Sequence, residues 1–346
     1  MSAIPRIELA AGYSISRVLK GGWQLAGGHG PVDEAAALAD MDRFVEAGVT
    51  TFDCADIYTG VEELIGRWMR RRKGRPGAGV QIHTKYVPDL DRLHLHARGD
   101  VVRGVDRSLA RLGVERLDLV QLHWWDYGVP GYVEAAGWLD ELRREGKIRH
   151  VGLTNFDRRR LAEIVAAGAR VTSHQVQYSV LDRRPAAGLA ADGARRGIGL
   201  LCYGAVAGGF LSERWLGSPD PAPPLENRSL VKYRLIIDEF GGWAIFQEML
   251  GALGRIAARQ EATIGAVAIR WALDQAGVAG VIVGARHARH LDQIRKACEL
   301  ELDGEDRAEI ARVQAASSGP AGEVYALERV KGGRHAGIMR YGLQRS

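Results

Sequence analysis

Short runs of β-branched and apolar residues alternate with longer amphipathic stretches along most of the chain. The short runs are typical of buried strands, and apolar positions spaced three and four apart are typical of helices that pack on one face. The predicted strands are Val18–Trp23, Thr50–Asp53, Val80–Lys85, Leu117–His123, Ile148–Leu153, Thr172–Val176, Gly199–Tyr203 and Val278–Val283. The predicted helices are Val32–Ala47, Glu62–Arg72, Asp100–Leu112, Tyr132–Arg144, Arg158–Ala167, Trp243–Gln275 with an interruption near Thr263, and Ala288–Glu299.

This alternation predicts an α/β fold, because strands connected through helices pair in parallel. Eight strand–helix units in 346 residues favour a closed (β/α)8 TIM barrel. The competing doubly wound open sheet needs a G-x-G-x-x-G turn after the first strand. The nearest candidate, Gly27-Gly28-His29-Gly30, lacks that spacing. We therefore predict a single barrel over residues 1–316, followed by a tail over residues 317–346.

Two segments interrupt the pattern. The segment Gly208–Leu230 follows the seventh strand and holds four of the eleven prolines, Pro219, Pro221, Pro223 and Pro224. Because proline disfavours helices and strand ladders, we predict a long loop over the C-terminal face of the barrel. The tail is glycine-rich and basic, but it carries five large apolar or aromatic residues and is expected to pack on the barrel. These residues are Tyr325, Leu327, Ile338, Met339 and Tyr341.

The composition is that of an ordinary globular protein, with 46% hydrophobic and 26% charged residues. No apolar run approaches the roughly 18 residues of a membrane span, and the first residues lack the layout of a secretory signal, which favours the cytoplasm. The cysteines Cys54, Cys202 and Cys298 are too scattered for a disulfide framework and are interpreted as free thiols.

Neither nucleic acid nor metal binding is expected from the charged residues. The net charge is +5, but arginines alternate with acids, and the basic run Met69–Arg75 ends a predicted helix without interleaved aromatics. His94 and His96 lack the spacing of a zinc site, and His287 and His290 are interpreted as exposed helix residues.

Four polar residues occupy the position where barrels place catalysis, at or just past the C-terminal ends of strands. Asp53 ends the second strand and Tyr58 follows five residues later, while Lys85 and His123 end the third and fourth strands. Neighbouring strands in a barrel bring these ends together in space.

These residue types suit carbonyl reduction, in which hydride transfer to the carbonyl carbon leaves an alkoxide that needs a proton. A free tyrosine, with a pKa of about 10, is a poor donor near neutrality. A nearby lysine cation lowers that pKa, and an aspartate fixes the lysine. A neutral histidine beside the tyrosine can orient the carbonyl oxygen.

The segment Gly48–Glu62 resembles the aldo-keto reductase signature, a G-x-x-x-F-D-x-A-x-x-Y-G-x-x-E pattern. Further resemblances cover roughly residues 15 to 300. They include Thr84-Lys85, Asp118–Trp124, Gly146–Phe156, Gln175–Ser179, Tyr203 with Ala207–Leu211, and Val281–Arg286. The resemblance implies a catalytic tetrad of Asp53, Tyr58, Lys85 and His123, with Tyr58 as the general acid.

The same resemblance implies a nicotinamide cofactor. Thr154, Asn155 and Gln175 are expected to bind the carboxamide, Tyr203 to stack on the ring, and the backbone of Val206–Leu211 to hold the pyrophosphate. Arg286, at the start of a helix, is expected to meet the adenosine 2′-phosphate, which favours NADP(H) over NAD(H). The full predicted cofactor set is Gly22, Trp23, Asp53, Thr154, Asn155, Gln175, Tyr203, Gly204, Val206, Gly208, Leu211, Gly284, Arg286 and Gln293.

The chain departs from the family pattern at three places that concern the cofactor. Gly204-Ala205 replaces the usual serine-proline, Val283 replaces a proline common in the last strand, and Gln293-Ile294 replaces an acid–asparagine pair that contacts adenine. Ile294 cannot make the hydrogen bonds of that asparagine. The departures bear on cofactor preference rather than on cofactor class.

The predicted substrate pocket contains Trp23, Tyr58, His123 and Trp124, with Trp125 assigned to packing. The primary hypothesis is reversible, NADP(H)-dependent reduction of an aldehyde or ketone. One alternative is an NAD-dependent sugar or pyridoxal dehydrogenase that works oxidatively. Another is a slowly turning-over regulatory subunit, as in family members attached to potassium channels.

Overall fold

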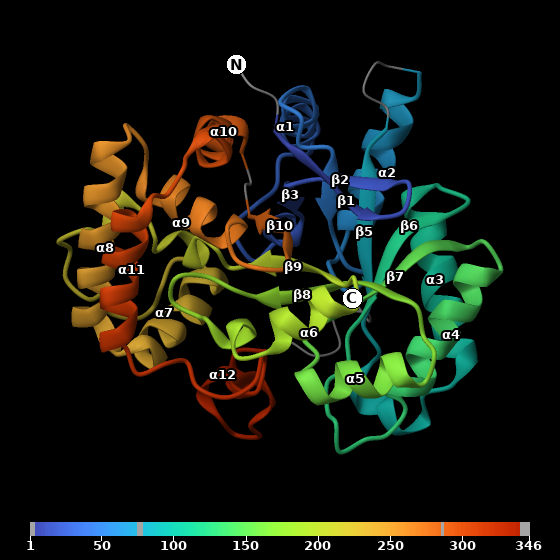
Figure 1. The fold of residues 1–346 in the computed structure, drawn as a ribbon. Coiled ribbons are helices and arrows are strands. Elements are labelled where there is room, and N and C mark those ends of the chain that lie inside the picture. Colours follow the sequence, from blue (N-terminus) through green and yellow to red (C-terminus); the bar gives the residue numbers. More distant parts are fainter. Residues whose placement is uncertain (1–3, 75–78, 285–286, 340–346) are drawn as a thin grey trace.

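Eight parallel strands close into a barrel in the computed structural model, which describes residues 4–74, 79–284 and 287–339 (Figure 1). The strands pair in the order β10-β3-β4-β5-β6-β7-β8-β9. Their bounds are β3 Val18–Gly21, β4 Thr51–Asp53, β5 Gln81–Tyr86, β6 Leu117–Leu122, β7 Ile148–Thr154, β8 Val171–Gln177, β9 Gly199–Tyr203 and β10 Val278–Val283. The predicted TIM barrel and its eight strands are confirmed.

Helices surround the barrel, with α3 and α4 on one side of the view and α8 and α11 on the other (Figure 1). The predicted interruption near Thr263 is confirmed, because the Thr263 side chain caps α9 by accepting from the Ala266 amide. The bounds are α1 Glu34–Glu46, α2 Val61–Arg72, α3 Arg98–Leu112, α4 Tyr132–Arg144, α5 Arg158–Ala166, α6 Leu189–Arg195, α7 Arg228–Phe240, α8 Gly242–Arg259, α9 Ile264–Leu273, α10 Leu291–Glu299, α11 Gly304–Ala316 and α12 Arg334–Gly337. No helix of the described residues is long and apolar enough to cross a membrane.

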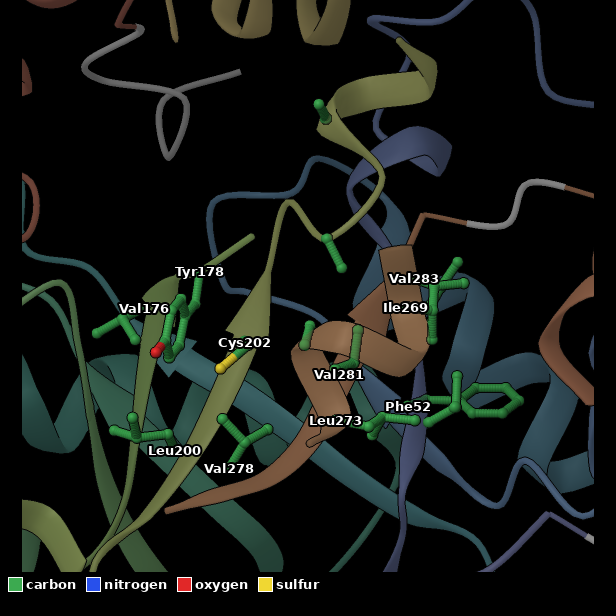
Figure 2. Packing of buried hydrophobic residues seen from close by; sticks show 14 of the residues in the cluster. Phe52, Val176, Tyr178, Leu200, Cys202, Ile269, Leu273, Val278, Val281 and Val283 are labelled. Atoms are coloured by element: carbon green, nitrogen blue, oxygen red, sulfur yellow. The ribbon is translucent and has the colours of Figure 1, made fainter. Parts of the chain in front are cut away.

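The alternation of side chains along each strand divides the apolar residues into two buried clusters. One residue of a strand packs outward against the helices, as Leu200 and Val281 do, and its neighbour belongs to the barrel interior, as Leu201 and Ile282 do. Figure 2 shows part of the outer cluster, where strand residues lie beside α9. The labelled residues there include Val176, Leu200, Cys202, Val278 and Val281 of the strands and Ile269 and Leu273 of the helix.

An antiparallel hairpin before the barrel was not predicted. It consists of β1 Arg6–Ala10 and β2 Tyr13–Ser16, with Gly12 at a φ of 67° in the turn. Tyr13 and Ile15 belong to the interior cluster, and the Tyr13 hydroxyl lies 3.0 Å from His83 Nε2. The hairpin therefore closes one end of the barrel, which leaves the other end for a cavity.

The segment after β9 is not the continuous loop predicted over Gly208–Leu230. Short 3-10 turns form at Ala207–Gly209 and Glu213–Trp215, and α7 begins at Arg228, before the predicted loop ends. The Asn227 side chain caps α7 by accepting from the Leu230 amide at 3.1 Å. The prolines stop regular structure only between these elements.

Candidate active site

The four residues of the predicted tetrad meet at the C-terminal end of the barrel because backbone hydrogen bonds continue past the strand ends. The Gly22 amide donates to Asp53 O at 2.7 Å, and the His123 amide donates to Tyr86 O at 3.0 Å. These bonds hold the ends of β3 and β4, and of β5 and β6, level with one another. Residues separated by up to 70 positions therefore share one site.

Lys85 and Asp53 form a buried ion pair, with Lys85 Nζ 2.6 Å from Asp53 Oδ2. The ammonium also donates to Cys54 O at 2.8 Å. Burial by itself favours the neutral amine, but the charge of Asp53 and the neighbouring Tyr58 outweigh it and raise the pKa of Lys85. Lys85 is therefore a cation across the physiological pH range.

Tyr58 lies above this pair in the turn between β4 and α2. Its ring centroid is 5.2 Å from Lys85 Nζ and 5.1 Å from the Trp23 ring. Burial raises the pKa of Tyr58, and the charge and hydrogen bond of Lys85 oppose this increase without cancelling it. The expected lowering of the Tyr58 pKa below its usual value is therefore not found in this structure, although Lys85 acts in the expected direction.

His123 is buried beside these groups, and burial together with the charge of Arg329 lowers its pKa to about 3. Its imidazole is neutral near pH 7, as expected from the sequence. Its Nδ1 lies 3.4 Å from Thr154 O, and its Nε2 has no hydrogen-bond partner within the described part of the chain. This nitrogen is available to a ligand oxygen.

All four residues line one cavity of about 680 Å³ that extends across this end of the barrel. The cavity also contains most of the residues predicted to hold a cofactor. These are Trp23, Thr154, Asn155, Gln175, Tyr203, Gly204, Val206, Gly208, Leu211, Gly284 and Gln293. Arg286 lies outside the described residues.

Comparison with known proteins identifies the family. The model of the Aldo/keto reductase family matches residues 17–315. The chain belongs to the aldo/keto reductase family. The chain is 26% identical over 283 residues to the aldo-keto reductase yakc [NADP(+)] of Schizosaccharomyces pombe, which is 79% of this chain and 81% of that protein.

The chain is also similar to other known proteins. The flagellar radial spoke protein 5 of Chlamydomonas reinhardtii is 30% identical over 260 residues, or 64% of this chain. That match spans 49% of the relative, so the chain covers about half of its length. The solved structure of the thermostable aldo-keto reductase Tm1743 in complex with the inhibitor epalrestat is 26% identical, with a TM-score of 0.70 over 89% of this chain and 99% of that one.

The two adjacent tryptophans of this aldo/keto reductase occupy the opposite places from those predicted. Trp124 is fully buried outside the cavity, and its indole Nε1 donates to Asp126 O at 3.1 Å and Val129 O at 2.9 Å. Trp125 lines the cavity, 4.3 Å from the His123 ring, with its Nε1 donating to Pro88 O at 2.8 Å. The strand ends at Leu122, so alternation no longer determines which of the two side chains faces inward.

Gly22 does not line the cavity, in contrast to its predicted role in cofactor binding. A Cβ there would lie 3.0 Å from both Asp53 O and the Val61 side chain. The position is therefore closed by β4 and α2, and the glycine permits their close packing.

The replacement of serine-proline by Gly204-Ala205 has a local explanation. Gly204 has a φ of 83°, and a Cβ there would lie 2.6 Å from the Tyr233 hydroxyl. Tyr233 belongs to α7 and also lines the cavity. The glycine therefore accommodates α7 against the end of β9, which makes Tyr233 part of the cavity wall.

The tail contributes three cavity residues that were not assigned to the site from the sequence, Tyr325, Ile338 and Met339. Tyr325 lies edge-on to His123 at 5.4 Å. Arg329 anchors the segment, because it donates to Asn155 O at 3.0 Å and Trp124 O at 2.9 Å. The apolar residues of the tail were the available signal, but they did not show which part of the barrel they cover.

Basic residues also line the cavity, and most of them were not assigned to the site from the sequence. They are Arg214, Arg228, His287, Arg289 and His290. Arg228 was missed because α7 was not predicted, whereas His287 and His290 line the cavity although the side chain of His287 is 46% exposed. The described residues contain no cluster of three or more potential metal ligands.

Proposed function

We propose that this aldo/keto reductase reversibly reduces an aldehyde or ketone to an alcohol with a nicotinamide cofactor, NADP(H) in preference to NAD(H). Tyr58 is the proton donor, Lys85 and Asp53 support it, and His123 orients the substrate oxygen. The observation that carries this proposal is the buried Lys85–Asp53 pair beneath Tyr58, with all three residues in the wall of one large cavity.

The residues of the cavity suit such a cofactor. Thr154, Asn155 and Gln175 offer polar groups for a carboxamide, and the Tyr203 ring offers a stacking surface. When bound, the cofactor supplies or accepts the hydride. The basic residues of the cavity lining suit phosphate groups, and a relative bears NADP(+) in its name. These observations support the preference for NADP(H).

The proton chemistry follows from the burial of the site. When Tyr58 donates its proton to the substrate oxygen, a phenolate forms in a partly buried position where it loses much of its solvation by water. The Lys85 ammonium compensates for this loss, and Asp53 keeps the ammonium in place. His123, neutral because of burial, binds the same oxygen without adding a second charge.

The direct test uses the pure protein, NADPH and a panel of aldehydes and ketones. We expect loss of NADPH absorbance with at least one carbonyl compound. Absence of both turnover and cofactor binding would refute the proposal.

Two variants test the assigned roles. Tyr58→Phe removes the proton donor, so turnover is expected to fall by about 10²–10⁴-fold while NADPH affinity stays nearly unchanged. Near-normal turnover would show that another residue is the acid. Arg286→Ala is expected to weaken NADPH binding far more than NADH binding, and equal losses would show that Arg286 does not bind the 2′-phosphate.

A further inference from the structure

The Gln175 side chain is held by hydrogen bonds from the core side of the site. Its Nε2 donates to Asp53 Oδ1 at 2.6 Å and to Gln121 Oε1 at 3.1 Å. A primary amide nitrogen has two hydrogens, so both are used. The atom of this amide that can meet a ligand in the cavity is therefore the oxygen, Oε1.

The direction of the amide is dictated by its neighbours. The Asp53 carboxylate, paired with Lys85, can only accept hydrogen bonds. If Gln175 were rotated by half a turn, two oxygens would face each other in a buried space, which is costly. Asp53 and Gln121 together thus select one of the two possible orientations.

Gln121 completes this arrangement from β6 without touching the cavity. It is fully buried and does not belong to the cavity lining. Its Nε2 donates to the same Asp53 oxygen at 3.1 Å, while its Oε1 accepts from Gln175. Among the residues that the structure describes, Gln121 is therefore the one group hydrogen-bonded both to the Asp53 carboxylate and to the Gln175 amide.

We propose that Gln121 is a positioning residue that, together with Asp53, fixes the orientation of the Gln175 amide, so that Gln175 Oε1 accepts a hydrogen bond from the N–H of a nicotinamide carboxamide. This inference rests on the proposed function, in which Gln175 meets the carboxamide. It adds that Gln121, a residue outside the cavity, helps to turn Gln175 Oε1 toward the cavity. The cofactor's carboxamide must then present its N–H toward β8.

The test compares NADP+ with its acetylpyridine analogue, in which a methyl ketone replaces the carboxamide and no N–H remains. Dissociation constants for both are measured by fluorescence titration. Gln121→Met keeps the length of the side chain but removes both hydrogen bonds. We expect this variant to weaken NADP+ binding about fivefold, the effect of about one hydrogen bond, and to leave analogue binding within twofold.

Gln177→Leu is the matched control, because Gln177 is a buried glutamine of β8, the strand of Gln175, and it donates to Asp182 instead of Asp53. In Gln177→Leu, the dissociation constants for NADP+ and for the acetylpyridine analogue should change by the same factor or stay unchanged. ADP-ribose 2′-phosphate, which lacks the nicotinamide, should bind wild type and Gln121→Met equally, and this equality also verifies folding. If Gln121→Met does not fold, Gln121→Leu replaces it.

The outcomes separate this inference from the proposed function. If Gln175→Met removes the discrimination between NADP+ and the analogue but Gln121→Met leaves it intact, the positioning role is overturned and the assignment of Gln175 stands. If neither variant changes the discrimination, the assignment of Gln175 to the carboxamide is overturned as well. Equal weakening of both dinucleotides by Gln121→Met would indicate a merely structural role and would also overturn the inference.

Discussion

Arg329 offers a quantitative test of whether the tail forms part of the substrate site. Its guanidinium donates to Trp124 O and Asn155 O, and it lies 4.0 Å from the centroid of the Tyr127 ring. A hydrogen bond to a charged group contributes about 1.5–3 kcal/mol, and a cation over an aromatic ring about 0.5–2 kcal/mol. Because the freed groups regain water, we expect Arg329→Ala to weaken docking of the tail by about 2–3 kcal/mol.

The expected consequence is specific to the substrate. Tyr325, Ile338 and Met339 line the cavity, so a tail that undocks more often should raise KM for the carbonyl compound. A loss of about 2–3 kcal/mol changes the docking equilibrium by about 30–150-fold, which is the upper limit of the increase in KM. NADPH affinity should change much less, because Arg329 contacts Asn155, a residue expected to hold the cofactor, through its backbone carbonyl and not through its side chain. The assays are steady-state kinetics, cofactor titration and hydrogen exchange of the backbone amides of residues 317–339.

The control is Arg334→Ala, which removes an arginine of the same segment whose side chain is 66% exposed and pairs with Asp238. Exposed ion pairs contribute little, so this variant should behave like the wild type. The reasoning is refuted if Arg329→Ala leaves both KM and amide exchange unchanged, or if it weakens NADPH as strongly as the substrate.

Three further predictions concern the core of the site. Lys85→Met leaves a buried carboxylate without its cation and should destabilise the fold by about 3–5 kcal/mol in denaturant unfolding, whereas a loss below about 1 kcal/mol would argue against a buried pair. Trp124→Ala should cost about 3–5 kcal/mol of stability, because the side chain is fully buried, while Trp125→Ala should mainly raise substrate KM; the reverse pattern would contradict the structure. Burial lowers the pKa of His83 and of His174 to about 3, so the unfolded chain binds protons that the folded chain does not, and stability should fall as pH decreases from about 6.5 toward 3. Each histidine contributes about 2 kcal/mol of this loss between about pH 7 and 5. If replacing one histidine by phenylalanine leaves the slope of unfolding free energy against pH unchanged, that histidine does not contribute to the loss.

Much of the barrel could be predicted from the sequence because its signals are local. A buried strand needs a short apolar run, and an amphipathic helix needs a repeat of three to four residues; both are visible without tertiary structure. The parallel order then follows from alternation, which brings Asp53, Lys85 and His123 to one end. The Tyr58 position was recognised because it stands five residues from Asp53 in the family signature.

Besides α6, α11 and α12, the prediction missed two elements for which signals existed. The helix α7 has a capping residue, Asn227, and apolar residues at Leu230, Tyr233, Ile236 and Ile237, but the prolines before it suggested a loop for the whole segment. The hairpin β1–β2 is short and carries charged residues, so its sequence does not stand out from an irregular segment before the first barrel strand. Its apolar residues Leu9, Tyr13 and Ile15 are buried only by packing against the barrel interior.

The sequence by itself determined the fold class, the order of the strands and the set of reactive groups, because these depend on periodicity and on residue type. Only the tertiary structure decided which of Trp124 and Trp125 faces the cavity, that the tail covers His123, and that burial outweighs Lys85 in setting the pKa of Tyr58. These properties depend on distances between side chains remote in the chain and on the exclusion of water around them. Neither quantity is encoded at any single position, so each appears only when the barrel closes.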